Sequence, residues 1–381
     1  MNMRKLLQPK ERGFVMPLAL LAVVVLLVMG TGLLSLAQHN RLLTVRAASD
    51  IAARCAADAG LTKAVFEMNQ RLKDGTWDSN SLPQSMHEAL PNCDATFGYT
   101  IEPDLDSSYV VGCVGNSGCA SRTVSATLRL RGLFDYGILT QDTITLKSGT
   151  IVDGYDSQNP SDGDVPVQIA TTSSDEGSID LSPGATVDGE VLVGIDAYFP
   201  TVTPPPLPDM GAITVETGPL TISAEDSGKY TSIDTKQGTT LIFDGGGEVV
   251  LHVTGNIDLG QDSELLIQPG TSLVIYLDGD LYARNSAGIN NATEDSTSFV
   301  LYGTGENQTF DLKAKTEWYG AVYAPNADVT IRADADVYGS FVTSNFETTG
   351  GGSHIYYDAA LRDVSETDVA AYFAVDRWQE Q

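Results

Sequence analysis

Histidine and the basic residues are scarce in this chain of 381 residues. Four His are present, and 22 Lys and Arg face 50 Asp and Glu, so the formal net charge is −28. Nucleic-acid binding needs clustered cations to contact phosphates, and this balance argues against such a partner. The few His argue against a His-rich metal site. The sequence also lacks a G-x-S-x-G element, a P-loop and a recognisable catalytic triad, so nothing in it predicts nucleophilic catalysis.

Carboxylates are abundant, and a polysaccharide-active enzyme needs two of them in fixed positions. Most of these Asp and Glu stand in turn-like contexts, where Asp tolerates the backbone geometry, so their number is poor evidence for an enzyme. One cluster suits calcium, because hard oxygen donors gather in DGYDSQNPSDGD: Asp153, Asp156, Asp162 and Asp164. Its spacing is not that of an EF-hand, and a solvated acidic loop is the alternative. No other cofactor is expected.

The N-terminal region holds one long run without charge. Residues 14–37 read FVMPLALLAVVVLLVMGTGLLSLA, which is 24 residues, whereas about 20 span a bilayer as a helix. A cleaved signal has an apolar region of about 7–15 residues. Arg4, Lys5, Lys10 and Arg12 precede the run, so the N-terminus is expected in the cytoplasm. We predict a single-pass protein of a bacterial inner membrane with a periplasmic body; a signal peptide removed whole is the alternative.

Helical periodicity continues beyond the apolar run. Apolar residues recur at three- and four-residue steps from Leu42 to Leu72, and no Pro or clustered Gly interrupts them before Asp74-Gly75. The pattern predicts one helix from about Phe14 to Leu72, about 90 Å long. Its second half is amphipathic and needs a surface to lie on. Strand-like runs at 96–101, 109–111 and 123–130 provide one, which predicts a small α+β head.

The cysteines are few and lie beyond the membrane segment, where an oxidising compartment is expected. They are Cys55, Cys93, Cys113 and Cys119. A disulfide could close the short loop from Cys113 to Cys119, which leaves Cys55 and Cys93 to pair. Four cysteines allow three pairings, so spacing does not establish the connectivity. A zinc site is the less favoured interpretation, because the chain has no C-x-x-C and no nearby His.

Beyond about residue 133 the composition changes to short apolar runs separated by Gly, Asp, Asn and Ser. SGTIVDG at 148–154 matches PGATVDG at 183–189 with an offset of 35. Imperfect repetition of this kind suits a parallel β-helix, in which each coil stacks on the last. A β-sandwich is the alternative, and the two differ in whether strands pair in parallel. The Pro-rich stretch at 201–209 is interpreted as a loop within this domain, the alternative being a stiff spacer between two domains.

Two resemblances to known families follow from particular motifs. The long helix with its basic leader resembles a type IV pilin, and KERGF at 10–14 is similar to a prepilin peptidase site, with cleavage after Gly13 and Phe14 as the new N-methylated terminus. RGFVMPLALL at 12–21 and RCAADAGLTKAV at 54–65 resemble PilX-type minor pilins. Most pilins place Glu at the fifth mature position, where it neutralises a neighbouring amine. Here Leu18 stands there, which suggests a tip or initiating subunit; family drift is the alternative.

The second resemblance concerns the C-terminal half. YGAVYAPNADV at 319–329, YGSFV at 338–342 and HIYYDAAL at 354–361 resemble the domain of unknown function DUF7305, and GYDS at 154–157 fits its early turn. The resemblance covers about 133–362. It implies an extracytoplasmic, β-helix-like domain with no established activity.

These observations predict five segments: a basic prepilin-type leader (1–13), a transmembrane and amphipathic helix (14–73), a pilin-like head (74–132), a repetitive β-helix-like domain (133–362) and a C-terminal tail (363–381). The expected function is that of a non-enzymatic minor pilin, in assembly priming and tip or surface contact. Expected partners are other pilin subunits, the pilus assembly machinery, prepilin peptidase, the inner membrane, and a surface glycan or protein. A static membrane-anchored β-helix scaffold is one alternative, and a surface polysaccharide-active enzyme is another.

Overall fold

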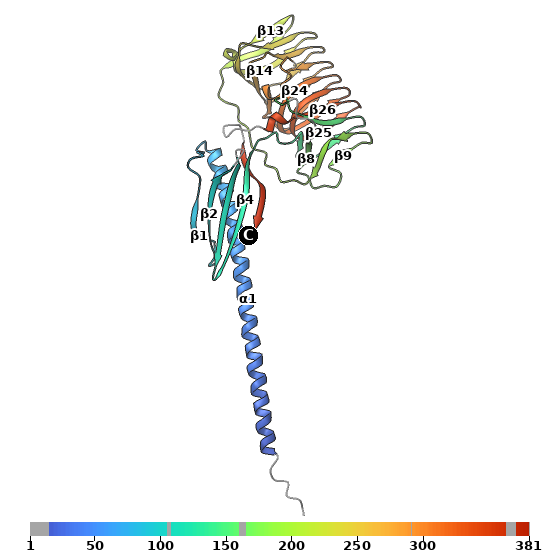
Figure 1. Ribbon diagram of the computed structural model, residues 1–381. Helices are drawn as coiled ribbons and strands as arrows, with labels where there is room; N and C mark the ends of the chain where they lie inside the picture. The colour runs from blue at the N-terminus through green and yellow to red at the C-terminus, as the bar shows by residue number, and fades with distance from the viewer. Residues whose placement is uncertain (1–14, 105–107, 160–164, 291, 363–370, 381) are drawn as a thin grey trace, which may run out of the picture. The chain divides into compact units, whose positions relative to one another are not determined.

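The computed structural model describes residues 15–104, 108–159, 165–290, 292–362 and 371–380. The chain forms two compact units: Met1–Arg129 together with Phe373–Gln381, and Leu130–Tyr372. The first contains the helix and an antiparallel sheet, and the second is a large parallel β structure (Figure 1). The expected combination of a long apolar N-terminal helix and a parallel β domain is confirmed.

The first unit is built on α1 (Val15–Lys73), a single helix of 59 residues. It matches the helix that periodicity predicts. The sheet that covers its second half has the order β1-β2-β3-β4-β27. Its strands are β1 (Ser85–Ala89), β2 (Thr96–Pro103), β3 (Ser108–Ser117), β4 (Ala120–Arg131) and β27 (Tyr372–Glu380). Burial alternates along β2 and β3, which places one apolar face against α1.

The last strand of this sheet comes from the far end of the chain, where sequence patterns indicate only a tail. Phe373 of β27 is buried against Trp77 and Tyr109, with ring centroids 4.7 and 5.3 Å away. The Asn69 side-chain amide donates to the Phe373 carbonyl at 3.0 Å, and its oxygen accepts the Phe373 N–H at 2.6 Å. The whole β domain is therefore an insertion between two strands of one sheet.

The second unit is a parallel β-helix of 22 strands in which every pairing with a described register is parallel. The β-sandwich alternative is thereby excluded. The strands are β5 (Ile138–Thr140), β6 (Ile144–Leu146), β7 (Ile151–Tyr155), β8 (Val167–Thr171), β9 (Ile179–Leu181), β10 (Thr186–Val187), β11 (Gly189–Val193), β12 (Asp209–Val215), β13 (Pro219–Ile222), β14 (Gly228–Thr235), β15 (Thr240–Phe243), β16 (Gly247–Val253), β17 (Ile257–Leu259), β18 (Glu264–Ile267), β19 (Thr271–Leu277), β20 (Leu281–Ala283), β21 (Gly288–Ile289), β22 (Phe299–Gly303), β23 (Gln308–Leu312), β24 (Glu317–Arg332), β25 (Asp336–Thr349) and β26 (His354–Asp358). Three short 3-10 helices, η1 (Ala224–Asp226), η2 (Ser296–Ser298) and η3 (Ala359–Arg362), lie between strands.

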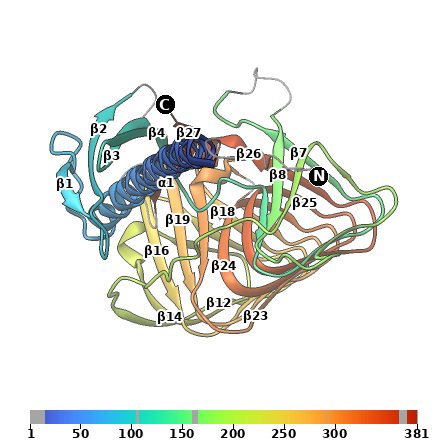
Figure 2. The ribbon, with the colours of Figure 1, turned by 90° about the horizontal axis from the view of Figure 1, so that it is seen from below.

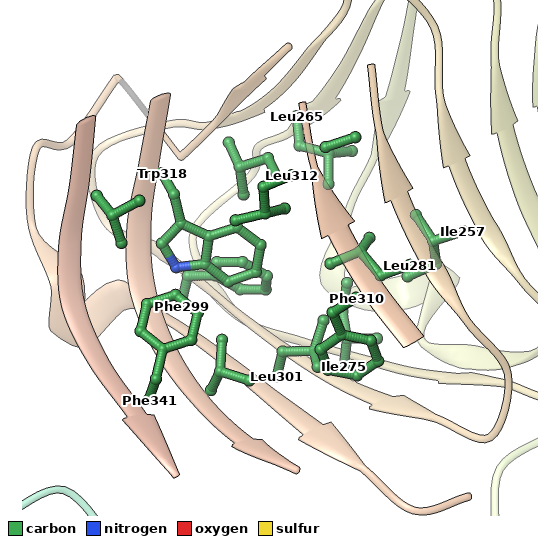
Figure 3. Close-up of a cluster of buried hydrophobic side chains, with 14 of the residues drawn as sticks. Ile257, Leu265, Ile275, Leu281, Phe299, Leu301, Phe310, Leu312, Trp318 and Phe341 are labelled. Carbon is green, nitrogen blue, oxygen red and sulfur yellow. The ribbon is translucent and has the colours of Figure 1, made fainter. Parts of the chain in front are cut away.

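The coils do not stack in chain order. β5 pairs with β25, and β7 lies between β26 and β10, so the first coils of the domain stack on its last (Figure 2). The internal repeat seen in the sequence is one of these contacts, because Ile151 pairs with Thr186 and Val152 with Val187 at the offset of 35. The side chains directed inward form one continuous apolar core, which includes Trp318, Phe299 and Phe341 (Figure 3).

The Pro-rich segment joins the two ends of this β-helix. One residue from each coil belongs to a row in which every residue is the register partner of the next on the neighbouring strand. From one end of the β-helix to the other, the row is Asp209, Lys229, His252, Tyr276, Tyr302, Tyr323, Val342, Leu139, Ala170 and Leu192. Its nine steps of about 4.8 Å separate the ends by about 43 Å. The 17 residue-to-residue steps from Leu192 to Asp209 reach about 53 Å as polyproline II helix but only about 26 Å as α-helix. The segment therefore has to be nearly extended.

Side-chain contacts place the same segment on the outer side of that row. The Tyr323 hydroxyl donates to the Pro200 carbonyl at 2.8 Å. Phe199 and Val202 pack against the cluster that contains Tyr302 and Tyr323. The segment therefore covers aromatic side chains of a single β-helix and does not divide two domains, in agreement with the loop interpretation.

Candidate functional site

The first half of α1 is an exposed apolar surface. From Met16 to Val45 its large apolar side chains are between 47% and 84% exposed. It is the one helix, among the described residues, that is long and apolar enough to cross a membrane. This agrees with a membrane anchor or a signal segment. Gly13 and Phe14, the predicted processing site, lie outside the described residues.

The second half of α1 packs against β3 at backbone distance. Its buried face carries small residues, among them Ala53, Ala56 and Ala57, which are fully buried. A Cβ atom on Gly115 would lie 2.0 Å from the Ala53 carbonyl oxygen and 2.4 Å from the Ala57 nitrogen. Glycine is therefore required where the strand crosses the helix, and this contact fixes the position of the head along α1.

Ion pairs at the edges of the head add to this packing. The Arg122 guanidinium donates to both Asp50 carboxylate oxygens, at 2.7 and 2.8 Å. Lys63 pairs with Glu88 of β1 and lies 3.6 Å from Glu67. The hydrogen bond from Lys63, together with one from Ser85, lowers the pKa of Glu88. These contacts join α1 to β1 and β4, the strands on either side of the buried pair.

The expected disulfides are absent, because all four cysteines are free thiols. Cys113 pairs across the hairpin with Val124, and Cys119 lies in the turn, just after Gly118. Four strand steps from Cys113 to Ser117 cover about 14 Å, whereas a disulfide joins Cα atoms less than about 7 Å apart. Cys113 is also buried against α1, and burial raises the pKa of its thiol to about 12. Cys55 and Cys93 are exposed and unpaired.

The calcium prediction stays a prediction. Asp162 and Asp164 lie outside the described residues, and within the described residues no group of three or more His, Cys, Asp or Glu is placed to hold a metal ion. Asp156 accepts hydrogen bonds from the Gln158 and Asn159 N–H groups and from the Asn159 side chain, which lowers its pKa. Asp153 accepts from the neighbouring Gly154 N–H at 2.8 Å.

Two ladders on the outer faces of the β-helix were not predicted. Tyr319, Tyr338 and Tyr356 stack in register, with ring centroids 4.3 and 4.8 Å apart. The spacing of the two Tyr-Gly pairs, at 319–320 and 338–339, is the sequence signal that could have shown the first step. On another face, carboxylates pair with cations. Three pairs cross from coil to coil, Asp258 with Arg284, Asp311 with Arg332 and Glu347 with Lys147, and two lie within one coil, Asp234 with Lys236 and Asp311 with Lys313.

Charge is divided unequally between the two units. Leu130–Tyr372 contains nine Lys and Arg against 37 Asp and Glu, a net charge of −28, so the rest of the chain is formally neutral. Five of those nine cations are in the ion-pair ladder. The acidity is thus a property of the β-helix, and its other surfaces have few cations to balance their carboxylates.

Comparison with known proteins gives one family match. Residues 213–364 match the family described as "Domain of unknown function (DUF7305)". The motifs indicate a resemblance to this family over about 133–362. The match shows the family over 213–364 of that range. A search of curated proteins found no match.

Two solved structures are similar to this chain. The ice-binding protein of the Antarctic ascomycete Antarctomyces psychrotrophicus is 14% identical, over 58% of this chain and 93% of that one, with a TM-score of 0.34. The competence-associated pilin ComZ of Thermus thermophilus is 12% identical, over 88% of this chain and 98% of that one, with a TM-score of 0.23.

Proposed function

We propose that this chain is a minor-pilin-like subunit, anchored in a bacterial inner membrane by α1 and processed after Gly13. One observation carries the proposal: a single helix is uncharged and exposed over its first turns and packed beneath an antiparallel sheet over its last. A plain signal anchor needs about 20 apolar residues and does not need a helix of 59 that continues into the core of a head. A filament subunit needs both halves.

The proposed role follows from this division of α1. Its apolar half holds the subunit in the membrane, with the N-terminus in the cytoplasm, and later packs among the helices of other pilin subunits. Leu18 replaces a carboxylate that would be costly to bury without a partner amine, which supports a tip or priming position. The acidic β-helix is the part proposed to contact a surface glycan or protein. The proposed work is assembly and contact without catalysis.

The N-terminal residue of the membrane-extracted protein tests this proposal. Mass spectrometry of protein co-expressed with a prepilin peptidase should find N-methylated Phe14. Gly13→Val should keep the leader. Gly30→Val is the matched control, since a Cβ atom on Gly30 meets nothing within 4 Å, and its N-terminus should be that of the wild type.

Other termini support other functions. An intact Met1 in the presence of active peptidase would contradict the proposal and favour a static membrane-anchored scaffold. A terminus beyond Ala37 would identify a secreted protein and favour the surface-enzyme alternative. The tip position is tested separately by gold labelling of purified filaments, which should mark ends; labelling along the whole length would refute it.

A further inference from the structure

One end of the β-helix core is open. The last coil there consists of β9, β10 and β11, which pair with β6, β7 and β8, and no described strand lies on their other side. Leu181, Val191 and Val193 continue the inward-facing rows but are 37%, 41% and 51% exposed. Leu146 and Ile169, on which the first two stack, are fully buried. Apolar side chains of the core therefore reach the surface at this end.

The opposite end buries more of its inward side chains. In its terminal strands β12 and β13, the inward residues Ile213, Val215 and Ile222 are 3%, 3% and 7% exposed, and Leu220 is 37% exposed. Lys229 also lies 3.9 Å from Asp209 at that end and balances a carboxylate. Met210 is 44% exposed there, and among the described strands β12 and β13, like β9–β11, pair on one side only. The two ends differ in charge and in the burial of their inward side chains, and the end at 179–193 exposes more of its inward row.

The open end presents free backbone groups as well. The Val167 N–H donates to the Asp188 carbonyl at 3.0 Å. Along a parallel strand, alternate residues point their N–H and C=O groups to the same side, so Asp188, Glu190 and Leu192 point theirs toward β8. The N–H and C=O groups of Gly189, Val191 and Val193 therefore point to the open side. An unpaired edge of this kind is a template for another strand.

Charge selects the occupant of this edge. From residue 148 to 228 the sequence has no Lys, Arg or His and 14 Asp and Glu. Asp180, Asp188 and Glu190 are exposed on the terminal coil and form no ion pair among the described residues. A second copy of this chain, docked end to end by two-fold symmetry, would bring the same carboxylates together. A cationic strand would neutralise them.

We propose that the β9–β10–β11 end of the β-helix binds an extended, Lys- or Arg-rich strand of another protein. The strand pairs with the free edge of β11, places its apolar side chains over Val191, Val193 and Leu181, and directs its cations toward Glu190 and Asp188. This inference depends only on the unit Leu130–Tyr372 and stands apart from the proposed role of α1.

Synthetic strands test the proposal on the full chain in non-ionic detergent. The probe is a fluorescent peptide of alternating Lys and Val, measured by anisotropy. Binding should weaken about tenfold or more in Glu190→Lys and in Val191→Asn, and should fall with salt. Glu225→Lys, the same charge change at an exposed position of the opposite end, should bind like the wild type. A peptide of equal charge with a central Pro should bind poorly, because Pro lacks the donor that pairing needs.

Three results would overturn the inference. Equal binding of the Pro peptide, or an equal loss in Glu225→Lys, would mean general attraction to an acidic protein. The absence of binding at low salt would remove the site. Self-association that Val191→Asn abolishes, detected by sedimentation, would assign this end to a second copy of the chain.

Discussion

At the scale of single residues, the closest contact in the head makes a sharp prediction. Gly115→Ala places a Cβ against backbone atoms of α1, at 2.0 Å from the Ala53 oxygen, so the strand or the helix backbone has to shift. Overpacking of this kind costs about 1–3 kcal/mol, and thermal unfolding of the head should show a loss at the upper end of that range. Gly112→Ala is the control, because its Cβ would meet only Thr100 Oγ1, at 3.7 Å. Equal stability of the two variants would contradict the backbone contact.

The best-buried carboxylate of the ion-pair ladder makes a prediction about pH. Burial alone would raise the pKa of Asp311, but the hydrogen bonds from Arg332, at 2.8 and 2.9 Å, and from Lys313 lower it. A lowered pKa stabilises the folded state above the unfolded value of about 3.9. That contribution is lost as the pH falls through the lower folded pKa.

Asp311→Asn should therefore cost about 1.5–3 kcal/mol at pH 7, and the difference from wild type should shrink below about pH 4. Denaturant unfolding at several pH values measures it. Asp258→Asn removes a more exposed pair with Arg284 and should cost at most about 1 kcal/mol. A larger cost for Asp258→Asn, or a difference that grows in acid, would refute the assignment.

At the scale of elements, the Pro-rich segment is a connector of fixed reach. Deletion of six residues, 203–208, leaves 11 steps between Leu192 and Asp209. These reach about 38 Å even when fully extended, which is short of the roughly 43 Å between the end coils. The deletion should abolish the cooperative unfolding of the β-helix, followed by circular dichroism. Replacement by six Gly and Ser residues keeps the length and should keep the fold with a lower Tm; native stability of the deletion would show that the segment takes another path.

At the scale of the whole molecule, the β-helix is a removable insertion. β27 begins at Phe373, which contacts Asn69 of α1, and reaches Glu380, which contacts Arg54, so it runs toward the N-terminus of the helix. β4 passes Arg122, which contacts Asp50 of α1, before it reaches Arg129, which contacts Asp376 in the middle of β27. It therefore runs toward the C-terminus of the helix. Opposite directions along α1 make the two strands antiparallel neighbours, so a short turn can join them. A chain with 133–370 replaced by a Gly-containing turn should fold as a head on α1. Protection from hydrogen exchange of the Phe373 backbone N–H, which donates to the Asn69 side chain, would show it, and a molten head would contradict it.

The elements of this protein are determined largely by local sequence. Hydropathy and the three- and four-residue spacing of apolar residues are enough to predict α1, because the residues that form this pattern are neighbours in the sequence. Alternation is likewise enough for β2, β15 and β18, and the repeat at an offset of 35 shows coils in register. That repeat favours parallel stacking, because inward positions must match from coil to coil, and the parallel registers of the structure exclude the β-sandwich.

Tertiary structure alone decides which ends of the chain meet. Inward side chains are alike on every coil, so local pattern does not distinguish β5 on β25 from any other stacking. The pairing of β27 with β4 and the path of 194–208 also depend on contacts between residues far apart in the sequence. The entropic cost of closing a loop rises only slowly with its length, so such distant pairings are not strongly disfavoured. The free state of Cys113 has the same origin: its spacing to Cys119 suggests a loop, but the hairpin register places Val124 opposite it. Local periodicity specifies the elements, and long-range packing specifies their partners.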